Sequence, residues 1–319
     1  MNRVIITGPT GAIGMALIEY LSRRKVQVIA VVRECSNRKD QIKESDNVIK
    51  VECDLSEIKD LPQKVAKVVN CPIDAFYHFA WDGTFGDSRN DMYLQNRNVR
   101  YALEAVDAAS ELGCGVFIGA GSQAEYGRYE GKLNAQVAAF PENGYGMAKL
   151  CAGQMTRVLC RQKGIRHIWT RILSVYGPYD GSKTMIMSLI RKMLNKERAS
   201  CTKGEQIWDY LYAKDAAKMM YLLGANGVDG KTYCLGSGVA RPLREYIEVM
   251  KEIVNPDAEI GFGDIAYSPK QVMYLCADIE PLIMDVGGVP EYTFDQGIQE
   301  TVEWYKTCKE NQDAGYDIL

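Results

Sequence analysis

The chain has 319 residues with 38 basic and 41 acidic side chains, which gives a formal net charge of −3. Hydrophobic residues make up 47% of the sequence, enough to bury the core of one large domain or two domains of modest size. The near-neutral charge argues against a nucleic-acid-binding surface or a polybasic membrane anchor, because both need an excess of Lys and Arg. Small-molecule chemistry is therefore the leading hypothesis.

Targeting signals and metal ligands are not evident. The first residues run directly into an apolar segment without the pattern of a signal peptide, and no apolar stretch reaches the roughly 20 residues of a membrane helix. We therefore expect a cytoplasmic protein with no membrane contact. Ten cysteines are scattered without a CxxC pair, and the chain has two histidines, so we expect reduced thiols and no metal site.

Short β-branched runs alternate with longer amphipathic segments through the first half of the chain. This alternation predicts βαβ units and a parallel sheet with helices on both faces, a doubly wound α/β fold of the Rossmann type. The predicted strands are 3–7, 26–32, 48–53, 73–80 and 116–119, and the predicted helices are 12–24, 57–69, 91–112 and 145–163.

The pattern becomes less regular after residue 178, where helices are predicted over 185–195, 215–223 and 243–253. We therefore predict a large first domain over residues 1–178. Residues 179–319 are predicted to form mainly a smaller α/β domain that binds the substrate, with a segment at roughly 205–236 returning to the first domain.

A glycine-rich turn joins the first predicted strand to the first predicted helix. In this G-x-x-G-x-x-G pattern, Gly8 would permit a tight turn, Gly11 would let backbone amides approach a pyrophosphate, and Gly14 would allow close packing of helix against strand. The helix N-terminus adds free N–H groups for an anion. The pattern predicts an NAD(P)-binding domain over 1–178, the alternative being a glycine-rich turn without a ligand. The predicted contacts are Thr7, Gly8, Thr10, Gly11, Ala12, Ile13 and Gly14.

The end of the second predicted strand favours NADP over NAD. NAD-preferring folds place an acidic residue there to bind the ribose, whereas this chain has Arg33. A guanidinium can form a forked contact with a 2′-phosphate, and Ser36 and Arg38 offer further donors. The alternative is that these are solvated loop residues and that Glu34 contacts the ribose of NAD.

Residues after the third and fourth predicted strands should complete the cofactor groove. Asp54 could meet the adenine amino group, with Leu55 beside it. Phe79, Ala80 and Trp81 end the fourth strand and should line the groove, although a core role for Phe79 is equally open.

Tyr145 and Lys149 are four residues apart and therefore share one face of the predicted helix. A free phenol titrates near pH 10, so it needs a nearby positive charge to act at neutral pH. Lys149 offers this charge and could also reach the nicotinamide ribose. Ser122 follows the fifth strand, where its hydroxyl could hold a substrate oxygen near Tyr145. Ser122, Tyr145 and Lys149 are therefore the predicted catalytic residues.

Together these motifs resemble the extended short-chain dehydrogenases/reductases, in the epimerase and dehydratase branch that modifies nucleotide-activated sugars. The residues that carry the resemblance are TGPTGAIG, Asn98-Val99, SQAEYG, YGMAK, RILSVYGP and IWDYLYAKD. The resemblance implies that Ser122, Tyr145 and Lys149 carry hydride and proton transfer at a sugar carbonyl or alcohol. It also implies that Leu173 and Ser174 flank the nicotinamide, and that helices 91–112 and 145–163 pair in a homodimer.

Two departures from the family pattern narrow the reaction. Sugar 4,6-dehydratases place Asp-Glu after the hydroxyl residue, whereas this chain has Gln123-Ala124, which disfavours dehydration; the next residue, Glu125, could reach the sugar or serve a structural role. Trp208 stands where many relatives have an arginine that binds the pyrophosphate; it could stack on a base or sugar while a basic residue such as Arg191 supplies the charge. The predicted substrate-binding residues are Ser122, Gln123, Trp208 and Arg191.

Cofactor choice and reaction type are linked. An epimerase oxidises and then reduces the same carbon with tightly held NAD, whereas a ketoreductase consumes NADPH as a diffusing cosubstrate. Arg33 therefore favours an NADPH-dependent reductase of a 4-keto-(di)deoxy nucleotide sugar. The alternatives are a nucleotide-sugar 4-epimerase with bound NAD and, in another class, a non-catalytic NADP-binding sensor.

Overall fold

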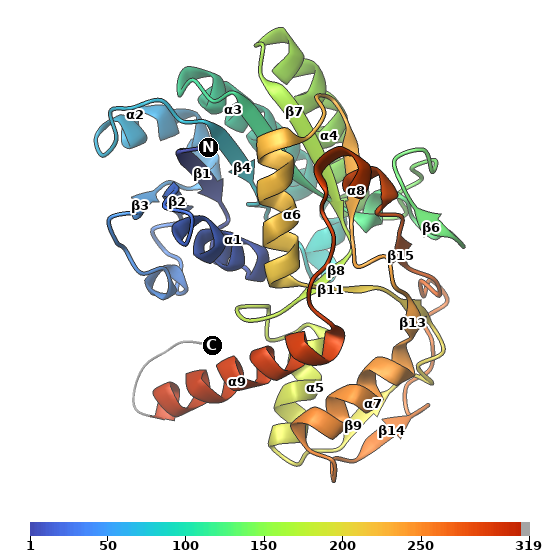
Figure 1. Cartoon of the computed structure of the whole chain (residues 1–319). Coiled ribbons are helices and arrows are strands. Elements are labelled where there is room, and N and C mark those ends of the chain that lie inside the picture. Colours follow the sequence, from blue (N-terminus) through green and yellow to red (C-terminus); the bar gives the residue numbers. More distant parts are fainter. Residues whose placement is uncertain (314–319) are drawn as a thin grey trace.

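The computed structural model describes residues 1–313 and has at its centre a seven-stranded parallel sheet (Figure 1). The strand order is β12-β7-β5-β4-β1-β2-β3, and each neighbouring pair is parallel. This order confirms the predicted doubly wound fold. The strands are β1 (Arg3–Thr7), β2 (Gln27–Val32), β3 (Val48–Glu52), β4 (Ala75–His78), β5 (Val116–Ser122), β7 (Arg166–Ile172) and β12 (Thr232–Leu235).

Helices cover both faces of the sheet. On one face α1 (Ala12–Ser22) packs against α6 (Ala213–Asn226). The other face carries α2 (Leu61–Ala66), α3 (Met92–Glu111) and α4 (Gly144–Gln162), of which α3 and α4 pack together. Because successive strand residues point to opposite faces and both faces are covered, the central strands are hydrophobic along their length.

A second lobe lies below the sheet in Figure 1 and contains α5 (Met185–Leu194), α7 (Leu243–Val254) and α9 (Phe294–Asp313) around their own apolar cluster. Short paired strands connect or extend the two parts. They are β6 (Lys132–Leu133) with β15 (Cys276–Ala277), β8 (Ser174–Tyr176) with β11 (Tyr210–Tyr212), β9 (Ala199–Cys201) with β14 (Ile260–Phe262), and β10 (Ile207–Trp208) with β13 (Arg241–Pro242). A short helix, α8 (Glu280–Val286), precedes α9.

Two features of the sheet region differ from the sequence expectations. The predicted helix over 57–69 is a 3-10 turn, η2 (Leu55–Asp60), followed by α2, because Pro62 favours the first turn of a new helix over the interior of a continuous one. Strand β7 was not predicted, since it carries buried polar residues. These are paired inside the protein: the Thr170 hydroxyl donates to the Gly119 carbonyl at 3.0 Å, and His167 Nε2 lies 3.0 Å from the Thr156 hydroxyl.

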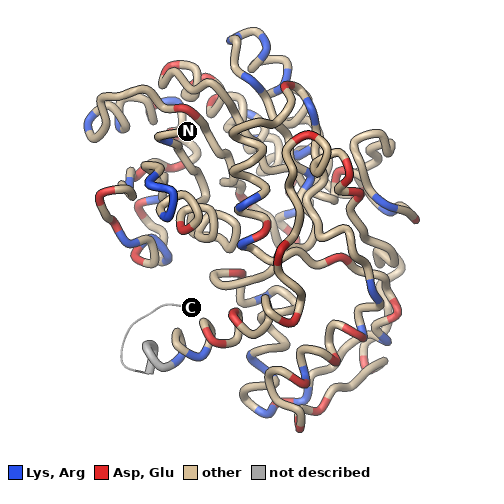
Figure 2. The backbone as a smooth tube through the Cα atoms, viewed as in Figure 1, with Lys and Arg blue, Asp and Glu red and all other residues tan. Residues whose placement is uncertain are grey.

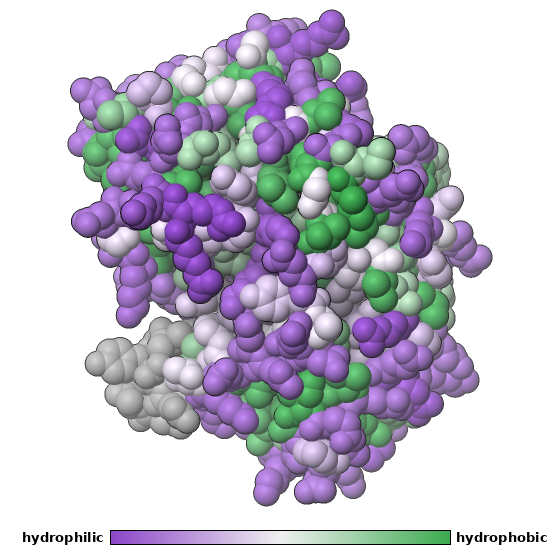
Figure 3. Space-filling view, in the orientation of Figure 1, coloured by the Kyte–Doolittle hydropathy of each residue, from purple (hydrophilic) through white to green (hydrophobic). Residues whose placement is uncertain are grey.

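The face of the molecule drawn in the figures shows no strong segregation of charge or hydropathy. Lys and Arg are interspersed with Asp and Glu along the backbone (Figure 2), and hydrophobic residues form separate patches among hydrophilic ones (Figure 3). Within residues 1–313, no helix combines the length and the apolar character needed to cross a membrane. The ten cysteines are free, and no group of three metal-ligating side chains occurs in the described part of the chain.

Candidate functional site

The glycine turn between β1 and α1 owes its shape to close backbone contacts. Gly8 has φ +66°, and a Cβ placed there would lie 2.7 Å from the backbone N of Ala80, just past β4. A Cβ on Gly14 would lie 2.5 Å from the carbonyl oxygen of Pro9, within the turn itself. The expectation that Gly14 serves helix-to-strand packing is therefore wrong, and Gly8 makes the close approach to the neighbouring strand end. Nothing lies within 4 Å of a Cβ on Gly11.

A cleft of about 330 Å³ opens beside this turn, at the carboxyl edge of the sheet where doubly wound folds bind ligands. Asp54 is not part of its lining, because its carboxylate caps η2 and accepts hydrogen bonds from the Ser56 backbone N–H (3.0 Å) and hydroxyl (2.8 Å). The predicted cofactor residues that do line the cleft are Thr7, Gly8, Thr10, Gly11, Arg33, Ser36, Arg38, Leu55, Phe79, Ala80 and Trp81.

The part of the cleft nearest the end of β2 is basic. Arg33 is exposed, with Nη1 3.6 Å from the carboxylate of Asp82, which also lines the cleft. Arg38 is half-buried and donates a hydrogen bond to the Tyr179 carbonyl, and burial lowers the pKa of its guanidinium. Glu34 is exposed and is not among the lining residues. Two guanidinium groups thus lie at this end of the cleft, with Asp82 beside Arg33 and the charge of Asp180 acting on Arg38.

These residues fit a dinucleotide on steric grounds. Side chains at Gly8 would collide with the end of β4, whereas the space beside Gly11 at the start of α1 is open. The free N–H groups of that helix end favour an anion. The remaining walls include apolar residues from the ends of β2 and β3 and from η2, which suit a flat ring system: Val31, Val32, Cys53, Leu55 and Ile58.

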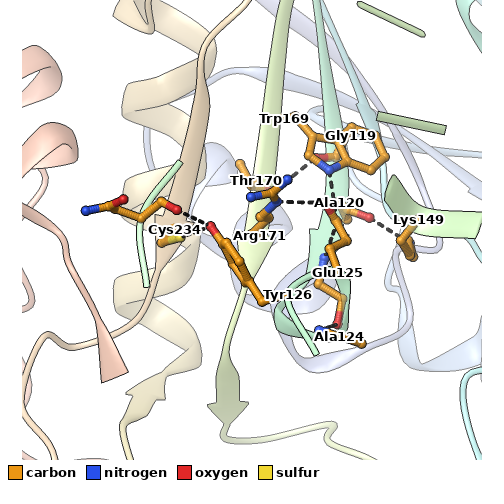
Figure 4. Close-up of polar contacts among 12 residues, drawn as sticks. Gly119, Ala120, Ala124, Glu125, Tyr126, Lys149, Trp169, Thr170, Arg171 and Cys234 are labelled. Atoms are coloured by element: carbon orange, nitrogen blue, oxygen red, sulfur yellow. Dashed lines mark hydrogen bonds and ion pairs between the residues drawn. The ribbon is translucent and has the colours of Figure 1, made fainter. Parts of the chain in front are cut away.

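Lys149 is buried on α4 and has two partners that hold its ammonium. Nζ donates to the carbonyl of Ala120 on β5 at 2.6 Å and lies 3.8 Å from the centre of the Trp81 ring (Figure 4 shows the first contact). Burial lowers the pKa of Lys149 to about 7, against the charge of Glu125, which raises it. Trp81 is thus both a wall of the cleft and a direct contact of Lys149.

Tyr145 lies one turn before Lys149, with its ring edge-on to Trp81 at 6.3 Å between ring centres. Burial raises the pKa of its phenol, while a hydrogen bond with Ser122 and the charge of Arg89 lower it. The Arg89 guanidinium carbon is 4.3 Å from the ring centre, whereas Lys149 Nζ is 5.8 Å away. The ammonium of Lys149 donates to Ala120 and lies farther from the ring centre than the Arg89 guanidinium does, and the expected effect of Lys149 on the phenol stays a prediction. Sequence reasoning missed Arg89, which has no motif of its own.

Ser122 ends β5 and caps a 3-10 turn, η4 (Gln123–Glu125). Its hydroxyl accepts from the Ala124 N–H at 3.2 Å, and its own N–H donates to Glu125 Oε1 at 2.8 Å. Glu125 is fully buried and ion-paired with Arg171 on β7, 2.7 Å from Nε to Oε2 (Figure 4). Glu125 could have contacted the sugar or served a structural role, and its burial assigns the structural one. Its carboxylate accepts from the Ser122 backbone N–H and does not face a substrate.

Of the residues predicted to contact the nicotinamide or the substrate, the structure brings only some close to one another. Trp208 Nε1 donates to the Ser174 hydroxyl at 2.8 Å. Leu173 is buried in a neighbouring apolar cluster. Arg191 is exposed on α5 and its ionic partner is Glu197 at 3.9 Å, so the structure does not bring it to Trp208. The substrate roles of Gln123, Trp208 and Arg191 stay predictions.

A doubly wound sheet with a glycine turn after β1, and with Ser, Tyr and Lys grouped near the end of β5, defines an extended short-chain dehydrogenase/reductase, a class of NAD(P)-dependent enzymes. The chain belongs to the NAD dependent epimerase/dehydratase family, whose model matches residues 4–236. The resemblance seen in the sequence motifs is confirmed.

Individual relatives cover different shares of the chain. The dTDP-glucose 4,6-dehydratase of Escherichia coli is 27% identical over 186 residues, 55% of this chain, which spans about half (51%) of that relative's length. CDP-abequose synthase of Salmonella typhimurium is 23% identical over 310 residues, 94% of this chain and 97% of the relative. The solved structure of UDP-glucuronic acid 4-epimerase from Bacillus cereus in complex with UDP-glucuronic acid and NAD has a TM-score of 0.82 at 18% identity, covering 96% of this chain and 99% of that one. At this identity the structural likeness supports the fold.

Proposed function

We propose that the chain is an NADPH-dependent reductase of a 4-keto-deoxy or 4-keto-dideoxy sugar linked to a nucleotide. The observation that supports this most is the cleft itself, whose β2 end presents Arg33 and Arg38 while Trp81 at its other side contacts Lys149. Two guanidinium groups suit the extra phosphate of NADP better than the ribose hydroxyls of NAD. A freely exchanging NADPH in turn suits net reduction better than epimerisation.

The cofactor would be held by backbone and side chains together. The turn from Gly8 to Gly11 and the start of α1 would hold the pyrophosphate, and Arg33 and Arg38 the 2′-phosphate. Leu55 and its apolar neighbours would cover the adenine. When bound, the nicotinamide supplies a hydride for the carbonyl carbon. Leu173 and Ser174 would lie beside it, as the family resemblance implies.

The protein's own groups would manage the oxygen of the reacting carbonyl. Glu125 holds the Ser122 backbone by accepting from its N–H, and the Ser122 hydroxyl would donate a hydrogen bond to this oxygen. Tyr145 would transfer its phenolic proton to the oxygen as negative charge develops there, a contribution of roughly 10²- to 10⁴-fold in rate. Lys149, fixed by Ala120 and Trp81, would hold the phenol and the cofactor in a constant position relative to each other.

The residues after Ser122 argue against dehydration despite the matches to dTDP-glucose 4,6-dehydratases. Elimination of water needs an acid and a base beside the sugar. Gln123 carries an amide that does not titrate, and Ala124 carries a buried methyl group. Neither can deliver or remove a proton.

The substrate class is inferred from the relative that matches along nearly the whole chain. CDP-abequose synthase, by its name, makes a CDP-linked sugar. We infer that this chain takes a nucleotide-linked sugar between the sheet and the second lobe formed by α5, α7 and α9, with CDP-linked and dTDP-linked compounds the first to test. Trp208 would contribute an aromatic face where relatives place an arginine.

The deciding experiment supplies NADPH with a panel of CDP-, dTDP- and UDP-linked 4-keto sugars. Steady, stoichiometric NADPH oxidation with appearance of the 4-hydroxy sugar is expected, and Tyr145→Phe should slow it by roughly 10²- to 10⁴-fold or more. Redox-neutral interconversion of finished nucleotide sugars, without net NADPH consumption, would instead identify a 4-epimerase. Tight NADP binding without either reaction would favour a sensor.

We also propose a homodimer through the outer face of α4. Four residues at helical spacing, Met147, Cys151, Met155 and Val158, are exposed there, although three of them are apolar and one is a thiol. Sedimentation at micromolar concentration should give a dimer, and Met155→Lys should dissociate it. Val68→Lys, at an exposed valine outside this face, is the control. A monomeric wild type would contradict the proposal.

A further inference from the structure

A positively charged side chain outside every recognised motif lies against the phenol of Tyr145. Arg89 belongs to η3 (Gly86–Asn90), in the segment between β4 and α3, and its guanidinium carbon is 4.3 Å from the centre of the Tyr145 ring. At this distance the cation interacts with the ring face. Lys149, the cation that the YxxxK spacing suggests for this role, has its Nζ 5.8 Å from the same ring centre.

Arg89 is held in this position from both sides. Its Nη1 donates to the carbonyl of Thr84 at 3.0 Å. The next residue, Asn90, accepts a hydrogen bond through Oδ1 from the N–H of Gly144 at 3.1 Å. A Cβ on Gly144 would lie 3.0 Å from the Arg89 carbonyl oxygen, so η3 packs directly on the first turn of α4, one residue before Tyr145. The position of Arg89 over the ring therefore follows from the docking of two elements.

The ammonium of Lys149 makes its closest contacts with Ala120 and Trp81. It donates to Ala120 and lies 3.8 Å from the Trp81 ring centre. Burial lowers its pKa to about 7. A guanidinium, by contrast, keeps its positive charge throughout the pH range in which enzymes work.

The charge of a phenolate spreads into the aromatic ring, so a cation over the ring face stabilises the phenolate more than the phenol. We propose that Arg89 is a positioning residue for Tyr145: its guanidinium over the ring face sets the pH range in which this phenol exchanges a proton with the substrate. The inference rests on the proposed function for the reaction, but the electrostatic effect on Tyr145 is independent of the substrate.

The charged and titratable groups that face Tyr145 come from four elements. Arg89 on η3 and the Ser122 hydroxyl at the end of β5 lower the pKa of the phenol, and Glu125 on η4 raises it. Lys149 faces it from the same helix. Glu125 is paired with Arg171. Of the two cations that face the ring, Arg89 lies closer to its centre than Lys149 does.

The test measures the titration of Tyr145 directly. Tyrosine labelled with carbon-13 at Cζ gives signals for the 19 tyrosines of the full-length chain, and the signal missing in Tyr145→Phe identifies the residue. In Arg89→Met the titration midpoint of this signal should rise by about one pH unit. If the midpoint lies above the pH range of the folded protein, the pH at which the signal first moves serves instead. Arg89→Lys, which keeps a charge, should stay within a few tenths of a unit of the wild type.

Arg157→Met is the control, because it removes the same charge from an exposed position on α4 that lies twelve residues from Tyr145, about 18 Å along the helix. It should leave the Tyr145 signal unchanged. Coincident titrations of wild type and Arg89→Met would overturn the proposal. So would an equal change in Arg89→Lys and Arg89→Met, since the charge would then be irrelevant. If Arg89→Met does not fold, Arg89→Gln replaces it.

Turnover separates this inference from the proposed reaction. In the reductase assay, the alkaline limb of the kcat profile should move to higher pH in Arg89→Met by the same amount as the NMR midpoint, with KM for NADPH unchanged. Absence of reduction in the wild type would defeat the proposed reaction and leave the NMR result standing. Reduction with an unmoved limb and an unmoved signal would defeat only the role of Arg89.

Discussion

The two ends of the candidate site are built by different means. The glycine turn is defined by backbone geometry within eight consecutive residues and one neighbouring strand end, as Gly8 beside Ala80 illustrates. The reacting centre gathers side chains from β4, η3, β5 and α4, and burial sets its electrostatics. The conformation of the glycine turn can therefore be predicted from its local sequence. The chemistry of the buried Tyr145 phenol, in contrast, depends on residues that are distant in sequence and that only the fold brings together. Perturbing each end should have distinct consequences.

The largest effect is expected at the reacting centre. Tyr145→Phe removes the proton donor and keeps the ring in contact with Trp81 and Arg89. Turnover should fall by roughly 10²- to 10⁴-fold or more, because a positioned proton donor is removed. Dinucleotide affinity, measured by calorimetry, should change less than about threefold, because the glycine turn is untouched. A parallel loss of affinity would mean that the two ends are not separable.

The second prediction concerns the stability cost of burying Lys149. Its pKa falls from the ordinary 10.5 to about 7 in the folded protein, so the folded state binds fewer protons than the unfolded state between these values. Stability should therefore rise with pH across this window. Lys149→Met should exceed the wild type in free energy of unfolding by about 2–4 kcal/mol below pH 7, after allowance for the Ala120 carbonyl that loses its donor.

Urea unfolding at about pH 6 and about pH 9 checks this sign. The advantage of Lys149→Met should shrink as pH rises from about 7 towards 10.5. Lys43→Met, at an exposed lysine, should show the same difference from wild type at both pH values. A pH-independent gap for Lys149→Met would show that its ammonium is not desolvated in the folded state.

The sequence was informative where signals are local. The order of strands and helices up to α4, the glycine turn, and the grouping of Ser122 with Tyr145 follow from periodicity and motif spacing. Strand β7 escaped prediction because Arg171 and its polar neighbours resemble surface residues until Glu125 is placed beside them. Arg89 escaped for the same reason: its partner lies 56 residues away, and only the docking of η3 on α4 makes the contact.

A third prediction sharpens the comparison within the glycine turn itself. Gly8→Ala forces a left-handed φ on a residue with a Cβ and drives that Cβ into the Ala80 backbone, so unfolding free energy should fall by about 1–3 kcal/mol and dinucleotide affinity with it. Gly11→Ala, where φ is −85° and nothing lies within 4 Å, should leave stability within about 0.5 kcal/mol. Any loss of affinity in Gly11→Ala then reports the approach of the pyrophosphate alone. Equal destabilisation by the two variants would contradict the assignment of the close contact to Gly8.

The smallest effect is expected at the cofactor-selecting end of the cleft, where Arg33 is exposed and already shares its charge with Asp82 at 3.6 Å. Arg33→Ala should weaken NADP binding by about tenfold, because one charge-assisted hydrogen bond to the 2′-phosphate disappears while Arg38 remains, and should change NAD binding by less than about twofold. Arg23→Ala removes an exposed arginine outside this cleft and should affect neither. Arg38 also donates a hydrogen bond to the Tyr179 carbonyl. A substitution of Arg38 would therefore change both the affinity for the cofactor and the position of the loop that contains Tyr179, so Arg33 is the better residue to test. Equal weakening of NAD and NADP would place Arg33 outside the 2′-phosphate contact and return the choice between reductase and epimerase to the sugar assay.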